Sequence, residues 1–340
     1  MKIRVPEKNK KPGLHYAVTD DGIELPVIDV THTAFSSRPS DSELDVLRNE
    51  ALRSFRKWQE MPGWVRWLVS KVVLGRGVLA RGIVASRGTY LAGLSTYLLK
   101  LGPDGLGSYA KRVDRIVAAT LPAISARIRL QNMARILADS LAPILRADAG
   151  RPLHFYNIGG GPAADSFNTL LLLKRDLSQT LSERPIRICS LDLDRDGPSF
   201  GQRAVAALMA EDAPLHGLEL TFEHVPYDWS RPEDLRGFLA AEGKQNIAAC
   251  SSEGALLEYG SDEQVVANLR ALHDETAEDS VFVGSVTRTD PASRELHRGV
   301  EAALKLRDMP EVDRLVNEGG WAISATADGP VNRSLKLVRA

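Results

Sequence analysis

Three successive glycines, Gly159, Gly160 and Gly161, follow an apolar run that ends at Ile158. Glycine has no Cβ, so such a run after a buried strand permits a sharp turn and lets the backbone approach a ligand closely. Residues 166–174 then have the character of a helix, whose first free N–H groups would face the same ligand. These residue types at this spacing predict a nucleotide-binding loop.

Acidic residues follow the next two apolar runs of the chain. Asp192 ends the second run, and Asp228 follows the third. Open α/β sheets bind ligands at the carboxyl ends of their strands, where Asp192 can accept hydrogen bonds from both hydroxyls of an adenosine ribose. Asp228, which lies between Tyr227 and Trp229, can serve the adenine amino group while an aromatic ring covers the base. Either acid could instead cap a helix, but recurrence at three strand ends favours one shared site.

The chain from residue 151 onward alternates short apolar runs with amphipathic segments. The first five runs are separated by segments long enough for crossover helices, which predicts parallel strands. The last two are joined by a segment too short for a helix, so we expect them to pair antiparallel. We therefore predict an α/β fold with a doubly wound, mostly parallel seven-stranded sheet and an antiparallel edge strand. The expected strands are residues 153–158, 186–191, 218–225, 247–251, 281–286, 321–326 and 335–339.

The N-terminal part of the chain has a different pattern. Residues 40–150 show helical spacing of apolar residues, interrupted by proline and glycine, and predict five or six helices. Residues 1–39 predict an extended segment with a hairpin around the Asp20-Asp21-Gly22 turn. We therefore expect an N-terminal segment (1–39), a helical lid or substrate domain (40–150) and a Rossmann-like domain (151–340).

Composition limits the classes of partner. The formal net charge of -1 offers no general attraction to nucleic acid or to anionic membranes. No run reaches the ~18 apolar residues of a membrane span, and no signal peptide is evident, so we expect a cytoplasmic protein. Cys189 and Cys250 lie in apolar runs and predict buried thiols rather than a disulfide framework or a metal site.

The stretch from residue 61 to 103 contains no acidic residue. It could form a lid that carries positive charge toward an anionic substrate or a carboxylate, or its cations could simply be solvated. A membrane-surface helix fits poorly, because basic residues five positions apart do not share one helix face. Aromatic residues here favour core packing over enclosure of a substrate. The basic residues are Arg66, Lys71, Arg76, Arg81, Arg87 and Lys100, and the aromatic ones are Trp64, Trp67, Tyr90 and Tyr97.

Residues 151–340 resemble the class I S-adenosylmethionine-dependent methyltransferases. The resemblance rests on the loop from Asn157 to Gly161, on Asp192 and Asp228 after the next two strands, and on residues 247–259. It implies a sheet with a sixth and an antiparallel seventh strand, and S-adenosylmethionine as cofactor. The residues that it implies for cofactor binding are Tyr156, Asn157, Gly159, Gly160, Gly161, Asp192, Leu193, Tyr227, Asp228 and Ser251. It places Ser252 and Glu253 beside the reacting methyl group, and together with Tyr259 they are the predicted catalytic residues. Tyr156 and Tyr259 could instead only pack, and Glu253 or Glu258 could only cap the next helix.

The loop departs from the family pattern in two positions. Asn157 stands where the family has an acid, so an amide oxygen or a water would hold the methionine amine. The second departure is Pro162, which follows the glycines. A Gly-x-Gly-Pro loop followed by Asp-x-Asp also resembles the nicotianamine synthases, which move the aminocarboxypropyl arm of the same cofactor. A nicotinamide dehydrogenase is disfavoured, because Ala164 replaces the third glycine of the dinucleotide motif and no catalytic domain follows.

The resulting prediction is an enzyme that methylates a small organic molecule by in-line displacement at the sulfonium. Transfer or cyclisation of the aminocarboxypropyl arm, which releases methylthioadenosine, stays open, as does a silent cofactor-binding module that mediates assembly. A nucleic-acid substrate is disfavoured, since no continuous basic face is evident. The acceptor, the oligomeric state (a homodimer among the options) and the base stay open, with His224 and Glu258 as further candidates.

Overall fold

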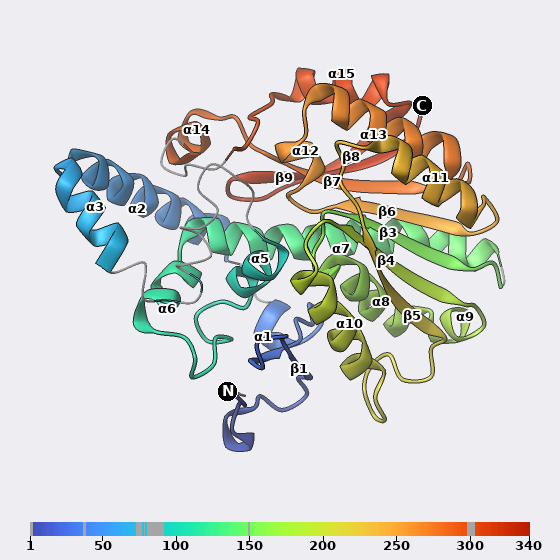
Figure 1. Ribbon diagram of the computed structural model, residues 1–340, viewed down its shortest axis with the longest axis horizontal. Helices are drawn as coiled ribbons and strands as arrows, with labels where there is room; N and C mark the ends of the chain where they lie inside the picture. Colours follow the sequence, from blue (N-terminus) through green and yellow to red (C-terminus); the bar gives the residue numbers. More distant parts are fainter. Residues whose placement is uncertain are drawn as a thin grey trace.

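A seven-stranded sheet forms the centre of the protein (Figure 1). The computed structural model describes residues 3–36, 39–72, 77, 79, 92–148, 150–297 and 303–340. The strand order is β5-β4-β3-β6-β7-β9-β8. The strands are β3 (Leu153–Ile158), β4 (Ile186–Asp192), β5 (Leu220–Pro226), β6 (Ile247–Ser252), β7 (Val281–Thr287), β8 (Trp321–Asp328) and β9 (Asn332–Arg339).

Strands β3 to β7 are parallel to one another, and β9 pairs antiparallel with both β7 and β8. The predicted fold class is therefore confirmed, with the antiparallel pair at one edge and β8 outermost. The chain moves outward from β3 to β5 and then returns to place β6 on the other side of β3. This reversal opens a crevice at the carboxyl ends of β3 and β6, where doubly wound sheets bind ligands.

Two apolar layers cover the sheet, one on each face (Figure 1). Helices α7, α8 and α10 contribute to the first layer, and α11, α13 and α15 to the second. Cys189 and Cys250 are buried free thiols in the second layer, and burial raises the pKa of each to about 12. The layer helices are α7 (Leu121–Ala147), α8 (Ala164–Asp176), α10 (Asp196–Met209), α11 (Pro232–Glu242), α13 (Asp262–Glu275) and α15 (Met309–Glu318).

The helical part before the sheet has the expected content. Within its described residues it contains α2 (Asp41–Glu60), α3 (Gly63–Val72), α5 (Gly93–Lys100), α6 (Arg112–Ala118) and α7. A capping box between Ser40 and Glu43 begins α2. Helix α7, which lies in the segment predicted as a lid, packs against α8 and against strands β7 and β9. It is therefore one of the helices that cover the sheet.

The aromatic residues of this part separate into two groups. Tyr97 is fully buried and confirms the prediction of core packing. Trp64 and Trp67 in α3 are 71% and 60% exposed, so that prediction is wrong for them. Helix α3 projects from the body of the protein next to α2 (Figure 1). Tyr90 lies outside the described residues.

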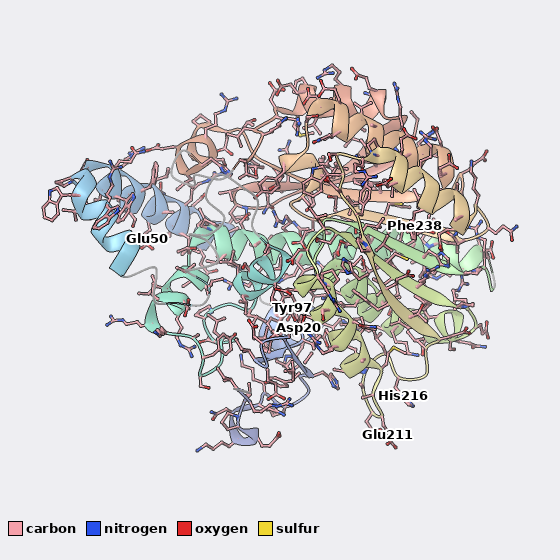
Figure 2. All side chains as sticks on the ribbon, viewed as in Figure 1. Asp20, Glu50, Tyr97, Glu211, His216 and Phe238 are labelled. Atoms are coloured by element: carbon pink, nitrogen blue, oxygen red, sulfur yellow. The ribbon has the colours of Figure 1, made fainter. Side chains whose placement is uncertain are left out.

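The predicted N-terminal hairpin forms between β1 (Tyr16–Val18) and β2 (Glu24–Pro26). The Tyr97 hydroxyl, labelled in Figure 2, donates to the Pro26 carbonyl at 2.9 Å and accepts from the Ile28 amide at 2.8 Å. Ser199 of α10 donates to Asp20 in the hairpin turn. These contacts fix the hairpin against α5 and α10, beside the end of the sheet that carries the glycine loop.

Among the residues whose placement the structure gives, no helix combines the length and the apolar character that crossing a lipid bilayer requires. No group of three or more His, Cys, Asp and Glu side chains among them is arranged to hold a metal ion.

Candidate active site

A cavity of about 310 Å³ lies at the carboxyl ends of β3 to β6, in the crevice opened by the sheet topology. It brings together residues that are far apart in the sequence. The predicted site residues that line it are Gly159, Gly160, Asp192, Leu193, Tyr227, Asp228, Glu253 and Tyr259. Asp194 and Trp229, next to two of these, also contribute.

The glycine loop requires glycine for two different reasons. Gly159 has a φ of +63°, and a Cβ there would lie 2.7 Å from the Cβ of Ala255 and 2.8 Å from the ring of Trp229. Gly161 has a φ of +53°, and its Cβ would lie 2.7 Å from the Cα of Gly93 at the start of α5. Gly159 therefore faces the cavity, whereas Gly161 does not line it and instead accommodates the backbone of a neighbouring helix.

Asp192 holds this loop in place. Its Oδ2 accepts a hydrogen bond from the Gly161 amide at 2.8 Å, and its Oδ1 accepts from the Asp194 amide at 2.9 Å. Burial raises the pKa of the Asp192 carboxyl, while these two amides oppose the shift. Each carboxylate oxygen can accept more than one hydrogen bond. Asp192 can therefore position the loop and accept hydroxyl donors from a ligand at the same time.

A buried polar cluster lies beneath the loop. Asn157 donates from Nδ2 to Asp165 Oδ1 at 2.5 Å and to Ser251 Oγ at 3.0 Å. Within the described part of the chain, Oδ1 of Asn157 and Oδ2 of Asp165 have no hydrogen-bond partner. Burial, with repulsion from Glu253, raises the pKa of Asp165 to about 6. Asn157 and Ser251 do not line the cavity, so their predicted cofactor contacts would have to come through the loop or through water.

Two further predicted residues also lie away from the cavity. The Tyr156 hydroxyl lies 3.1 Å from His154 Nδ1, and the Tyr156 ring packs edge-on against Phe238 in the second apolar layer. Ser252 Oγ donates to the Ile158 carbonyl and accepts from the Leu256 amide, both at 3.0 Å. Neither side chain lines the cavity, and both are satisfied by the fold.

His224 was a further candidate base. Its Nε2 lies 2.8 Å from the backbone oxygen of Asp192, which joins β5 to the end of β4. His224 does not line the cavity and has a structural contact of its own. This placement supports a structural role.

The sequence pattern did not reveal the contribution of α5. Gly93, Thr96 and Lys100 lie one turn apart on this helix and all line the cavity. Lys100 belongs to the basic stretch that was considered as a lid. It lies four residues after Thr96, and this helical spacing is the feature of the sequence that could have placed the two side chains on one face. Of the same stretch, Arg76, Arg81, Arg87 and the side chain of Lys71 lie outside the described residues.

Buried charges join α5 and α7 to the end of β6. Lys100 Nζ lies 2.6 Å from Glu253 Oε2, and Arg129 Nε lies 3.2 Å from Glu253 Oε1. Arg129 also reaches Glu258 in α12 (Leu256–Tyr259), with an Nη1–Oε1 distance of 3.4 Å. Burial lowers the pKa of Lys100 and raises that of Glu258, and in each case the opposite charge counteracts the shift. The network fixes both helices at the wall of the cavity.

The described wall of the cavity is rich in hydrogen-bond acceptors and negative charge. Four carboxylates, those of Asp192, Asp194, Asp228 and Glu253, face it with one ammonium group, that of Lys100. Such a wall suits a ligand with hydroxyl, amino and cationic groups. It disfavours the pyrophosphate of a dinucleotide, because the charges have the same sign.

One solved structure is similar over most of the chain. It is that of a possible exported protein from Bordetella parapertussis, with a TM-score of 0.57, 17% sequence identity, and coverage of 90% of this chain and 98% of that one. At this identity the similarity shows the fold alone. No protein-family model matches the sequence, and no curated protein shows significant sequence similarity to it.

Two methyltransferase structures show weaker similarity. One is magnesium protoporphyrin IX methyltransferase from Synechocystis PCC 6803 with bound S-adenosylhomocysteine (TM-score 0.41, 15% identity, 63% of this chain and 87% of that one). The other is 1,6-didemethyltoxoflavin-N1-methyltransferase from Burkholderia thailandensis, with S-adenosylhomocysteine and its substrate (TM-score 0.39, 14% identity, 62% and 77%). Similarities of this degree do not establish a shared activity.

Proposed function

We propose that this protein is an S-adenosylmethionine-dependent methyltransferase that acts on a small organic molecule. One observation carries the proposal. Gly159, Asp192 and Asp228, which follow three successive parallel strands, line the same cavity at the topological switch of the sheet. Nucleoside ligands bind at this position in doubly wound folds.

The groups on the cavity wall fit the proposed cofactor. Asp192 would accept hydrogen bonds from the ribose hydroxyls, and Asp228 from the adenine amino group. The ring of Trp229 lies next to Gly159, on the side where a Cβ would project, and would border the base. The carboxylates would attract the sulfonium and the ammonium group of the cofactor.

When bound, the cofactor supplies a methyl group whose bond to sulfur breaks as the acceptor's nucleophile attacks, with sulfur keeping the electron pair. The protein's task is then alignment and exclusion of water. Helix α5 covers the glycine loop at Gly93, and its Lys100 holds Glu253 at the cavity wall. Tyr259 and Glu253 are the predicted catalytic residues that line the cavity, and Tyr259 would orient the acceptor.

Product analysis tests this proposal. The purified protein is incubated with S-adenosylmethionine and a panel of small organic acceptors, and the by-product is identified by mass spectrometry. We expect S-adenosylhomocysteine. Methylthioadenosine would instead show that the aminocarboxypropyl arm moves, either to an acceptor or by cyclisation. Calorimetric titration without any binding would reject the cofactor assignment.

Three features predicted from the sequence stay predictions. They are the cytoplasmic location, the division of the chain at residues 39 and 150, and the oligomeric state, for which a homodimer is one option. Sedimentation of the full chain tests the last of these, and limited proteolysis followed by mass spectrometry tests the domain boundaries.

A further inference from the structure

A second cavity of about 300 Å³ adjoins the first. The two cavities share three lining residues, Thr96, Gly254 and Tyr259, which therefore form the boundary between them. The second cavity lies between α5, α6 and α7 on one side and the ends of β7 and β9 on the other. A molecule in it would face the contents of the first cavity across this boundary.

The lining of the second cavity is predominantly apolar. Side chains from several helices and from two strands contribute to it, so its shape depends on how the helical part is packed on the sheet. The aliphatic lining residues are Leu99, Val117, Ala126, Leu296, Leu304 and Val331. Burial of apolar ligand surface against such side chains is favourable by roughly 25 cal/mol per Å².

The charged groups of the second cavity neutralise one another. Among its described lining residues, Arg129 and Glu258 are an ion pair with an Nη1–Oε1 distance of 3.4 Å. The second carboxylate bound by Arg129 is that of Glu253, which lines the first cavity. Burial lowers the pKa of His297, which disfavours its charged form. The first cavity, in contrast, has four carboxylates at its described wall. Among the described lining residues of the second cavity, the ion pair leaves no net partner for a cationic or an anionic ligand.

We propose that the second cavity is the acceptor site and that it takes an uncharged, largely apolar small molecule. This inference rests on the proposed function, because it needs a cofactor in the first cavity. Thr96 and Tyr259 at the boundary would lie beside the reacting atom of the acceptor. Polar groups at the wall, those of Thr287, His297 and Asn332, would bind its polar substituent. The alternative of an anionic substrate drawn to a basic lid is not favoured, since Lys100 is already paired with Glu253.

Binding of a fluorescent probe to the full chain tests the inference. N-phenyl-1-naphthylamine is uncharged and apolar, and its emission rises in apolar surroundings. We expect it to bind saturably in the presence of saturating S-adenosylmethionine. We expect 8-anilinonaphthalene-1-sulfonate, which adds one negative charge to the same ring system, to bind at least tenfold more weakly. Displacement of the uncharged probe by the cofactor, or equal affinity for both probes, would overturn the proposal.

Two variants locate the probe. Ala126→Phe in α7 and Val331→Trp, just before β9, place bulk in the second cavity. Each should raise the dissociation constant of the probe at least tenfold. Asp139→Trp, at an exposed position of α7, is the matched control and should leave it unchanged. Calorimetry with S-adenosylmethionine shows whether each variant is folded and whether the first cavity is intact. If both variants bind cofactor and still bind the probe as the native chain does, the acceptor site is elsewhere, while the proposed function stands. If the native chain binds no cofactor, the proposed function fails first.

Discussion

Lys100 Nζ and Glu253 Oε2 lie 2.6 Å apart, and both side chains are almost completely buried. Lys100 ends α5, and Glu253 follows β6, so this ion pair links the N-terminal helical part to the strand ends of the sheet. The other oxygen of Glu253 is bound by Arg129 of α7. The helical part is thus fixed to the sheet by buried charges at the wall of the proposed cofactor site.

Removal of one partner of this pair should destabilise the fold. In Lys100→Met, Glu253 retains only Arg129, and breaking a buried ion pair costs about 3 kcal/mol or more. Urea unfolding measures the loss. The double variant Lys100→Met/Glu253→Gln should recover part of it, because no uncompensated carboxylate is then buried. An unfolding free energy of Lys100→Met equal to that of the native chain would show that the pair does not contribute.

Asp192→Ala should weaken binding of S-adenosylmethionine by about 1–3 kcal/mol, the range for hydrogen bonds that involve a charged group. The variant also removes the acceptor of the Gly161 amide, so the loop loses a constraint. Calorimetric titration measures the affinity. Asp196→Ala, at an exposed position at the start of α10, is the control and should bind as the native chain does. Equal affinity of both variants would remove Asp192 from the site.

Gly159→Ala should abolish cofactor binding. A Cβ at this position would press on Ala255 and on the ring of Trp229, both of which line the cavity. Gly217→Ala is the matched control, since Gly217 also has a positive φ, of +79°, but no atom within 4 Å of the added Cβ. Both variants should lose about 1–2 kcal/mol of stability from the left-handed backbone, measured by urea unfolding. Only Gly159→Ala should lose affinity, and retained binding would place the ligand elsewhere.

Asp165 should make stability depend on pH. Its pKa is raised to about 6 in the folded state by burial, from 3.8. The folded chain therefore holds a proton that the unfolded chain releases between these values, so this group's contribution falls as the pH rises from about 4 to about 6. In Asp165→Asn the free energy of unfolding should decline less over that interval. Asp176→Asn, an exposed position at the other end of α8, is the control. Identical pH profiles of Asp165→Asn and the native chain would contradict the assignment.

The sheet was predictable because its signals are local. Each of the seven apolar runs became a strand, and the length of each connection decided whether its strands run parallel or antiparallel. The same reasoning placed Asp192 and Asp228, since the carboxyl ends of parallel strands lie at the same edge of the sheet. The aromatic residues were less predictable. Trp64 and Trp67 lie three positions apart in α3, a spacing that suits a core, yet both rings are largely exposed.

The sequence by itself determined the doubly wound sheet, the glycine loop and the acids at the strand ends, because a strand and its turn depend on neighbouring residues. Only the tertiary structure decided that α5 supplies Lys100 to the cavity and that Gly161 packs against the backbone of Gly93. It also decided that Ser252 bonds to the Ile158 carbonyl and does not line the cavity. These features depend on contacts between segments distant in the chain. Such contacts depend on how side-chain volumes and buried charges fit together in the packed interior, and the spacing of neighbouring residues does not predict them.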